Sequence, residues 1–363
     1  MKYDLIRRKT RPVRVGNITI GGNAPISVQS MLNVDTHDAA AALAQTRALE
    51  AAGCDIVRLT VPDLAAADTI YTLKNAGVKV PLVADIHFDY RLALAAAERG
   101  ADKIRVNPGN IGDEARVREV ADACRRRGIP IRIGVNGGSL EKSILEKYGE
   151  PCAEALAESA LMHASLLEKC DFEDIVISIK SSDVPTMIAA NRLLAAKCDY
   201  PLHLGVTEAG GERMGSVKSA IGVGALLADG IGDTVRVSLT ADPVAEVAAA
   251  RRIFTALGIE GQCGLDIVSC PTCGRTKIDL ITLAADFERA ARAEGLIDLP
   301  LRVALMGCVV NGPGEAREAD LAVCGGDGEA LLIARGKPSR KIPEDRIVAE
   351  LIGELKKLKT QGG

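Results

Sequence analysis

The segment "PLVADIHFDYRLALAAAERGADKIRVNP", residues 81–108, contains the structural unit that repeats along most of the chain. A β-like run at 81–87 precedes an Ala- and Leu-rich stretch of helical periodicity, which ends at Gly100. A second β-like run follows at 103–108. This order predicts a βα unit, in which a crossover helix joins two parallel strands.

Eight β-like runs separated by helical patterns occur at residues 26–31, 55–61, 81–87, 103–108, 130–136, 174–180, 201–207 and 234–240. Eight βα units in about 240 residues are typical of a (β/α)8 barrel. A doubly wound open sheet can use the same units, but the polar pattern of the strands repeats around the whole set and favours a closed barrel. We therefore predict an α/β protein with an N-terminal TIM-type barrel over residues 1–255. The βα rhythm then stops, so we predict a smaller α+β domain over 256–363.

One face of the predicted strands carries polar side chains. In "KIRVNP", Ile104 and Val106 lie on one face and the polar residues on the other, because side chains alternate along a strand. The other runs alternate in the same way, and their polar residues lie toward the carboxyl ends, where barrel enzymes hold their active sites. The side chains predicted at this barrel mouth are Arg58, Asp85, His87, Arg105, Asn107, Arg132, Asn136, Lys180, Arg236 and Ser238.

Five of these side chains are cations, and the acidic side chains expected near them are Asp85 and Glu208. A single strand arginine is usually an edge residue whose head group reaches water. Five inward cations cannot all be paired by two carboxylates, so the mouth is expected to bind an anion. Arginine binds phosphate oxygens in a bidentate manner, and asparagine and serine add neutral donors. The predicted ligand is a small phosphate compound, and a diphosphate suits the number of cations better than a monophosphate.

The composition of the chain disfavours several classes of partner and cellular location for this protein. The 363 residues carry a net charge of −3, which does not favour a nucleic-acid partner, and only 2% are aromatic, which disfavours binding by base or sugar stacking. The N-terminal "MKYDLIRRKTRPVRVG" lacks the apolar core of a secretory signal, and no stretch approaches about 18 apolar residues. Ten cysteines without such a signal argue against a disulfide framework. We expect a cytoplasmic enzyme with no membrane partner.

The last third of the chain concentrates cysteines in two motifs. Cys270 and Cys273 form a C-x-x-C pair, Cys308 follows further on, and Glu315 lies in a Gly-Pro loop. Histidine is absent after position 203, which excludes a zinc finger with two cysteine and two histidine ligands. Three sites remain possible: zinc with Cys324 as a fourth ligand, a redox C-x-x-C, or an iron–sulfur cluster with a replaceable oxygen ligand. The spacing favours the cluster, because it uses Cys308 and leaves a position for the Glu315 carboxylate.

Several motifs together resemble the bacterial hydroxymethylbutenyl diphosphate synthase family, and the resemblance covers nearly the whole chain. They include "SCPTCGR" (269–275), "MGCVVNGPGEA" (306–316), "KIRVNPGNIG" (103–112) and "GVTEAG" (205–210). The resemblance implies a two-electron reductive ring opening of methylerythritol cyclodiphosphate to the linear enyl diphosphate, with loss of water, on the non-mevalonate route to isoprenoids. It also implies a [4Fe–4S] cluster.

The family resemblance assigns roles to individual residues. The cluster ligands would be Cys270, Cys273, Cys308 and Glu315. The diphosphate would be held by Arg58, Arg105, Asn107, Arg132, Asn136, Lys180, Arg236 and Ser238. Asp85, His87 and Glu208 would lie near the substrate hydroxyls, with Glu208 handling a proton and Glu315 also counted as catalytic. The implied partners are a flavodoxin or ferredoxin as electron donor, and a second copy of the chain whose cluster domain covers the barrel.

Two other functions stay open from the residues alone. A Schiff-base aldolase would use Lys180 as the nucleophile and the arginines as a phosphate site, with a structural zinc domain. This reading explains the barrel but not the Cys and Glu pattern. A non-enzymatic zinc module for binding a partner or nucleic acid is disfavoured by the charge and by the scarcity of aromatic residues.

Overall fold

The computed structural model describes residues 6–259, 264–310 and 312–361, without the side chains of Ser139 and Glu315. The chain divides into two compact units, Met1–Ile253 and Phe254–Gly363. Among the described residues, no helix combines the length and the apolar character needed to cross a membrane.

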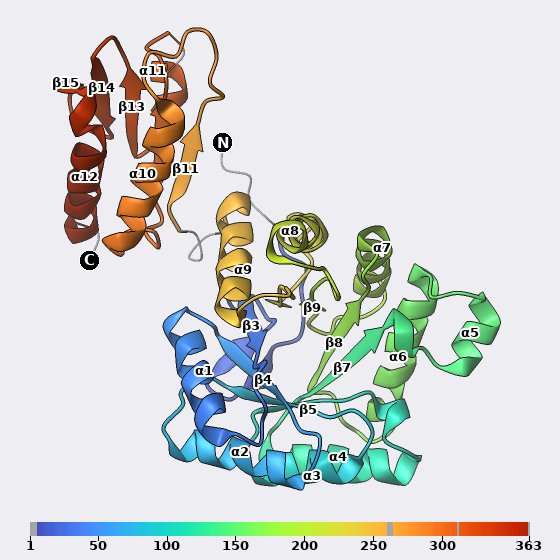
Figure 1. The fold of residues 1–363 in the computed structure, drawn as a ribbon. Helices are drawn as coiled ribbons and strands as arrows, with labels where there is room; N and C mark the ends of the chain where they lie inside the picture. The colour runs from blue at the N-terminus through green and yellow to red at the C-terminus, as the bar shows by residue number, and fades with distance from the viewer. Residues whose placement is uncertain (1–5, 260–263, 311, 362–363) are drawn as a thin grey trace. The chain divides into compact units, whose positions relative to one another are not determined.

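The first unit is built around a sheet of eight parallel strands in the order β8-β7-β6-β5-β4-β3-β10-β9 (Figure 1). An isolated parallel bridge between Ile177 of β8 and Leu202, just before β9, brings the two edges together. The predicted TIM-type barrel is therefore confirmed. The strands are β3 Ser27–Met31, β4 Ile56–Thr60, β5 Leu82–Asp85, β6 Lys103–Arg105, β7 Ile131–Asn136, β8 Ile175–Lys180, β9 His203–Leu204 and β10 Thr234–Val235.

Two strands are shorter than predicted. Regular pairing of β9 and β10 ends at Leu204 and Val235, whereas the sequence pattern continues to residues 207 and 240. Gly205 explains the early end, because a Cβ at this position would lie only 2.5 Å from the carbonyl oxygen of Arg236. Such a close approach of two backbones interrupts the regular ladder. The segments after β9 and β10 are thereby free to follow the barrel mouth.

Helices cover the outside of the barrel, and most begin at an aspartate. The side chains of Asp38, Asp63, Asp113 and Asp183 each accept a hydrogen bond from an amide of the first helical turn. This N-cap stops the preceding loop and fixes where the helix begins. The helices are α1 Ala39–Ala51, α2 Leu64–Asn75, α3 Tyr90–Glu98, α4 Glu114–Arg127, α5 Lys142–Tyr148, α6 Ala153–Glu168, α7 Val184–Ala195, α8 Glu212–Ala228 and α9 Pro243–Leu257.

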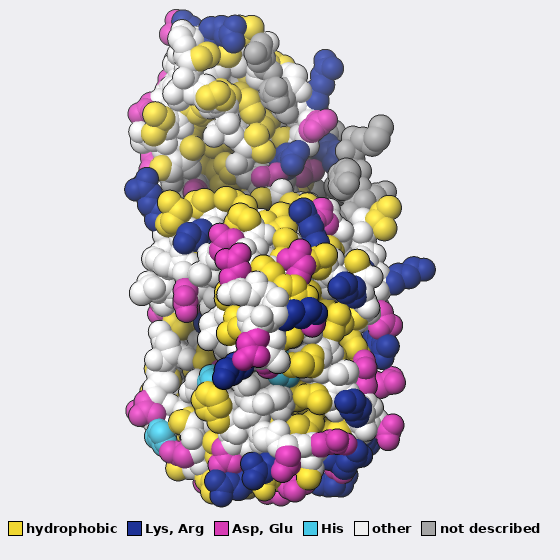
Figure 2. All heavy atoms as spheres, turned by 90° about the vertical axis from the view of Figure 1, so that its right-hand side faces the viewer, with side chains coloured by type: hydrophobic (Ala, Val, Ile, Leu, Met, Phe, Trp, Pro, Cys, Tyr) yellow, Lys and Arg dark blue, Asp and Glu magenta, His cyan; other side chains and the backbone are white. Residues whose placement is uncertain are grey.

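An antiparallel hairpin of β1 (Val13–Val15) and β2 (Ile18–Ile20) packs at the amino ends of the strands. Its Val15 and Ile20 are buried against Ile56 and Val83, which lie near the starts of β4 and β5. The opposite, carboxyl ends carry the polar side chains. On the barrel face shown in Figure 2, basic and acidic side chains are interspersed, as expected for a solvated surface.

The second unit contains a five-stranded sheet in the order β11-β12-β13-β14-β15. The strands are β11 Asp266–Ser269, β12 Arg302–Met306, β13 Leu321–Gly325, β14 Glu329–Ala334 and β15 Arg340–Pro343. The first three run parallel and the last two are antiparallel additions. This separate helix-and-sheet unit follows the barrel, as predicted.

Alternation along β12 supplies both faces of this sheet. Val303 and Leu305 belong to a core with Phe287 of α10 (Leu280–Ala293) and Leu351 of α12 (Ile347–Gln361). Ala304 and Met306 face the other side, where a smaller cluster includes Ala316 and Ala319. These residues follow the short α11 (Gly312–Glu315), so the second cysteine motif returns across the sheet.

Candidate active site

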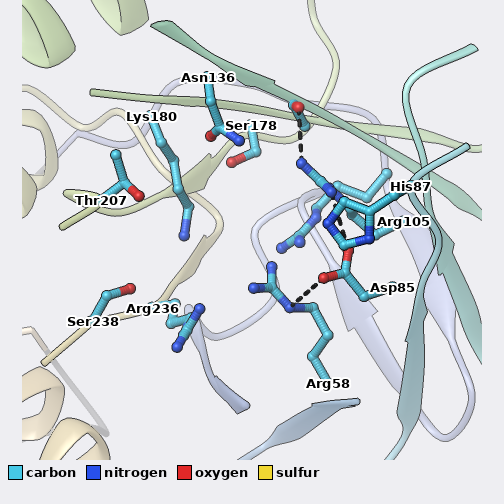
Figure 3. A pocket seen from close by; sticks show the side chains of 12 residues that line it. Arg58, Asp85, His87, Arg105, Asn136, Ser178, Lys180, Thr207, Arg236 and Ser238 are labelled. Atoms are coloured by element: carbon cyan, nitrogen blue, oxygen red, sulfur yellow. Dashed lines mark hydrogen bonds and ion pairs between the residues drawn. The ribbon is translucent and has the colours of Figure 1, made fainter. Parts of the chain in front are cut away.

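A polar cavity of about 140 Å³ lies at the carboxyl ends of the barrel strands (Figure 3). Strands β4 to β8 and the segments after β9 and β10 supply its walls, which consist of Arg58, Asp85, His87, Arg105, Arg132, Gly134, Asn136, Ser178, Lys180, Thr207, Arg236 and Ser238. Nine of these residues are among those predicted from the sequence. The strand alternation therefore brings side chains from most of the barrel to one place.

The cations of this cavity outnumber its carboxylates. Asp85 lies with its carboxylate 3.1 Å from Arg105 Nη1 and 3.7 Å from Arg58 Nε. Arg236 Nη2 lies 3.5 Å from an oxygen of Glu246, a buried residue near the start of α9. Two carboxylates thus face five cations, so the cavity has an excess of positive charge. Such a concentration of charge attracts an anion.

Burial makes this excess charge energetically costly. Arg132 is only 1% exposed, and its Nη1 donates a long hydrogen bond of 3.5 Å to the Gln29 side-chain oxygen. Burial together with Arg236 and Arg58 holds the pKa of Lys180 well below its ordinary value. Burial also lowers the pKa of Arg58 to about 10. Binding of an anion would supply the countercharge that these groups lack.

Asp85 is held in its ionised form. Burial alone raises the pKa of its carboxyl, but Arg58, Arg105 and Arg132 outweigh that effect and keep the pKa below its ordinary value. A carboxylate in this state accepts hydrogen bonds and orients the arginines, as the dashed contacts in Figure 3 show. It is poorly suited to donate a proton near neutral pH.

Two predicted residues lie beside the cavity rather than in its lining. The Asn107 side-chain oxygen accepts a hydrogen bond from the Gly134 amide at 2.8 Å, and the Gly134 carbonyl accepts one from Arg105 at 3.0 Å. Asn107 therefore joins the ends of β6 and β7. Glu208 is exposed and follows Thr207, with a left-handed φ of 52°. A non-glycine residue in this region carries strain that is often found at functional sites.

Cys270 and Cys308 lie at the carboxyl ends of two neighbouring strands of the second unit. Cys270 directly follows β11, and Cys308 follows the neighbouring parallel strand β12. The Gly307 amide donates a hydrogen bond to Cys270 Sγ at 3.3 Å, and the Lys277 amide donates one to the Gly307 carbonyl at 2.8 Å. These contacts hold the loop containing Cys273 against the end of β12.

This donor set fits a cluster with three thiolate ligands better than a four-thiolate zinc site. Cys273 is exposed, and a hydrogen bond from the Arg275 amide lowers its pKa, which favours the thiolate. Cys324 is buried in β13, and burial raises its pKa to about 11. Among the described residues, no three candidate ligands are gathered around a metal position. The Glu315 side chain, the predicted fourth ligand, lies outside the described part of the structure.

The sequence matches known protein domains over both units. Residues 10–251 match the GcpE TIM-barrel domain, and residues 266–357 match the GcpE protein C-terminal domain. The chain belongs to the GcpE family. The predicted family resemblance is confirmed by two curated relatives named 4-hydroxy-3-methylbut-2-en-1-yl diphosphate synthase (flavodoxin). The one from Caldanaerobacter subterraneus is 55% identical over 97% of this chain and 98% of its own length. The one from Geobacter sulfurreducens is 56% identical over 97% of this chain and 99% of its own length.

A solved structure shares the barrel fold of this GcpE-family chain. A type I 3-dehydroquinate dehydratase from Clostridium difficile aligns with a TM-score of 0.52 and 13% identity, covering 69% of this chain and 98% of its own. At this identity the likeness concerns the fold alone.

Sequence reasoning missed three residues of the lining in this GcpE-family barrel. Ser178 lies two residues before Lys180 on β8, and Gly134 lies two residues after Arg132 on β7. Both share a face with a predicted cation, so the alternation rule could have found them. Thr207 takes the place in the lining that was expected for its neighbour Glu208. Thr207 lies two residues after Gly205, whose Cβ position is 3.0 Å from Lys180 Nζ, so the alternation rule could have found it as well.

Proposed function

We propose that the chain catalyses the reductive ring opening and dehydration of 2-C-methyl-D-erythritol 2,4-cyclodiphosphate to 4-hydroxy-3-methylbut-2-enyl diphosphate, in the non-mevalonate route to isoprenoids. The main observation that supports this proposal is the cavity, which is lined by five cationic side chains and one carboxylate. Membership of the GcpE family, whose relatives carry the synthase name, agrees with this proposal. The reaction consumes two electrons and two protons and releases one water.

The cations would bind the two phosphoryl groups from several sides. Arg58, Arg105, Arg132, Lys180 and Arg236 come from five different strands or strand ends, so they surround a ligand rather than contact one edge of it. Guanidinium groups bind phosphate oxygens with two parallel hydrogen bonds. Ser178, Thr207 and Ser238 add hydroxyl groups that can bind the remaining oxygens. This arrangement would hold both phosphates in place while a neighbouring C–O bond breaks.

The chain must also supply a proton to the departing hydroxyl, so that it leaves as water while the C=C bond of the product forms. His87 lines the cavity, and Glu208 directly follows the lining residue Thr207 in the chain. We assign proton transfer to these two groups and keep Glu208 as the preferred donor. Asp85 would act by orienting Arg58 and Arg105, because the arginines keep it ionised. Asn107 would support the site through Gly134.

Cys270, Cys273, Cys308 and Glu315 would hold a [4Fe–4S] cluster. When bound, the cluster would supply the electrons and a Lewis-acid contact for the substrate oxygen. The Gly307 amide that donates to Cys270 Sγ would stabilise the thiolate. The 256–363 region is accordingly proposed as the cluster-binding domain and 1–255 as the substrate-binding barrel.

The proposed partners are a flavodoxin and a second copy of the chain. The relatives carry flavodoxin in their names, so we infer a flavodoxin as electron donor, with a ferredoxin as the other candidate. Helix α8 exposes Met214, Val217 and Ile221 along one stripe, which supports a contact with a second copy.

The nine described cysteines are free thiols, which supports a cytoplasmic location.

The function is tested by anaerobic turnover. The cluster-loaded protein is mixed with the cyclic diphosphate and reduced flavodoxin, and the phosphate products are followed by phosphorus NMR. Formation of the linear enyl diphosphate, dependent on the reductant, would support the proposal. Failure of cluster-loaded protein to consume the cyclic diphosphate would refute it.

The cluster assignment gives a prediction on metal content. Replacing Cys270, Cys273 or Cys308 with alanine should lower bound iron and acid-labile sulfide from about four of each per chain to a small fraction. Cys324→Ala is the matched control and should keep the cluster, because this buried thiol has a raised pKa. Stoichiometric zinc without sulfide in the unmodified protein would contradict the assignment.

Lys180 gives a prediction on pH dependence. In the free protein, burial and the neighbouring arginines hold its pKa well below the ordinary lysine value of about 10.4. A bound diphosphate favours the ammonium form and raises this pKa. Binding should therefore take up protons, and affinity should fall as pH rises through the range between the lowered pKa and about 10.4. Calorimetry in buffers of different ionisation enthalpy measures the uptake, and Lys180→Met should reduce it; equal uptake in both proteins would contradict the role of Lys180.

The Schiff-base aldolase remains the alternative use of the same lysine. A neutral Lys180 amine would suit a nucleophile, but the curated relatives support the synthase rather than an aldolase. Borohydride treatment of the protein with its substrate separates the two. A covalent adduct on Lys180 would support the aldolase, and its absence would leave the lysine as a phosphate ligand.

A further inference from the structure

His163 is a fully buried histidine that the proposed reaction does not use. It lies on α6 and contacts two loops of the barrel mouth, one after β6 and one after β7. The first loop follows Arg105 and contains Asn107, and the second follows Asn136. A buried histidine between two loops of the candidate site has the position to control how those loops are arranged.

One hydrogen bond and one close nitrogen–oxygen contact of His163 indicate its tautomer. The Gly109 amide donates to Nδ1 at 3.2 Å, so Nδ1 carries no proton. The neutral ring must then carry its proton on Nε2, which lies 2.5 Å from Oε1 of Glu141. Burial lowers the pKa of His163 despite the opposing effect of Glu141, which agrees with a neutral ring. One imidazole therefore contacts the β6–α4 loop with one nitrogen and the β7–α5 loop with the other.

Glu141 is itself anchored to α6. Its second oxygen accepts a hydrogen bond from Ser159 Oγ at 2.8 Å, and Ser159 lies one helical turn before His163. Both side chains are buried on the same side of the helix. Glu141 is also the residue that precedes α5, so this contact fixes where the β7–α5 loop ends.

Gly109 is adapted to the imidazole surface. A Cβ at this position would lie 2.7 Å from Cε1 of His163, closer than a real methyl group can approach, and 3.3 Å from its Nδ1. Packing thus explains why a glycine occupies this position of "NPGN", because its backbone lies directly against the ring. Any larger residue would push the β6–α4 loop away from α6.

The same two loops are also joined on the cavity side. Asn107 accepts from the Gly134 amide, and Arg105 donates to the Gly134 carbonyl. We propose that His163 is a positioning residue that couples the two loops from the outside, so that Arg105 and Asn136 present one preformed set of donors to the diphosphate. We call the contacts Gly109–His163–Glu141 the His163 bridge. This inference rests on the proposed function for its ligand, but the bridge itself can be tested without turnover.

Two conservative variants separate the arms of the bridge. Asparagine places an amide oxygen near the position of Nδ1. His163→Asn therefore keeps the contact with Gly109 and loses the contact with Glu141. Glutamine places an amide nitrogen near the position of Nε2. His163→Gln therefore keeps the contact with Glu141 and loses the hydrogen bond from Gly109. Hydrogen exchange should therefore accelerate in residues 137–141 for the first variant and in residues 107–112 for the second, by about tenfold in each case.

The kinetic result follows from the coupling. Both variants should raise KM for the cyclic diphosphate about tenfold and change kcat less than about twofold, because phosphate contacts serve the bound substrate and the transition state alike. Gly109→Ala should act like His163→Gln. Iron content should stay unchanged in all three variants.

Tyr200→Phe is the matched control. It removes a hydrogen bond of 2.7 Å to Glu168, the last residue of the same helix α6, without touching either mouth loop. It should lower the unfolding temperature and leave KM unchanged. If His163→Asn and His163→Gln behave like this control, the bridge is structural and the proposal is overturned. An inactive wild-type protein would overturn the proposed function instead, and the loop-specific exchange pattern would still decide the bridge.

Discussion

Replacing Arg105 with leucine should weaken binding of the cyclic diphosphate by about a hundredfold to a thousandfold and leave the iron content unchanged. Arg105 donates to Asp85 at 3.1 Å and to the Gly134 carbonyl at 3.0 Å, and it lines the cavity. Its loss removes hydrogen bonds to an anionic ligand that are worth about 1.5–3 kcal/mol each. It also leaves the buried Asp85 with Arg58 at 3.7 Å as its remaining ion-pair partner.

Calorimetric titration with the substrate, without a reductant, measures this affinity. Arg91→Leu is a suitable control, because Arg91 lies in the first turn of α3 with a side chain that is 73% exposed and pairs with Asp89. It should bind substrate like the unmodified protein. Loss of iron in Arg105→Leu would mean that this arginine supports the cluster domain rather than the substrate.

Replacing Glu315 with cysteine should preserve the cluster and reduce turnover on the order of a hundredfold or more. A thiolate binds iron more firmly than a carboxylate does, so the fourth position would no longer be replaceable. Mutations of groups that only contact metal ligands already cost about 10–100-fold, and a change of the ligand itself should cost at least as much. The measurement pairs iron and sulfide analysis with kcat on the same preparation.

Glu318→Cys provides the control for this prediction. Glu318 is exposed and lies at the end of the short helical turn that follows Glu315. A cysteine there adds a thiol without changing the proposed ligand set, so turnover should be retained. Near-normal turnover in Glu315→Cys would contradict the role of a replaceable carboxylate.

The barrel and most of its cavity could be predicted because both depend on local patterns. Alternation places Arg105 and Arg132 on one strand face wherever the strands pair, and the eight-fold repeat brings these faces together. Alternation also places Thr207 on this face, because it lies two residues after Gly205, whose Cβ position is 3.0 Å from Lys180 Nζ. The placement of Glu208 could not be predicted in this way, because its left-handed backbone interrupts the alternation.

The role of His163 shows the same limit more clearly. Its partner Gly109 lies 54 residues earlier, and nothing in the helical pattern of α6 distinguishes a histidine that holds a loop from one that fills a core. The cysteine motifs were predicted from their spacing. Their meeting at one sheet edge follows from the pairing of β11 with β12, which spacing alone does not establish.

The central claim is that the cation-lined cavity serves a reduction, and the number of electrons consumed per product tests it most directly. Cluster-loaded protein and a limiting, known amount of reduced donor are incubated with excess cyclic diphosphate, and the linear enyl diphosphate is counted. The account predicts two electrons consumed for each linear diphosphate formed. Ring opening without consumption of electrons would show that the cavity performs hydrolysis or elimination, and would contradict the account.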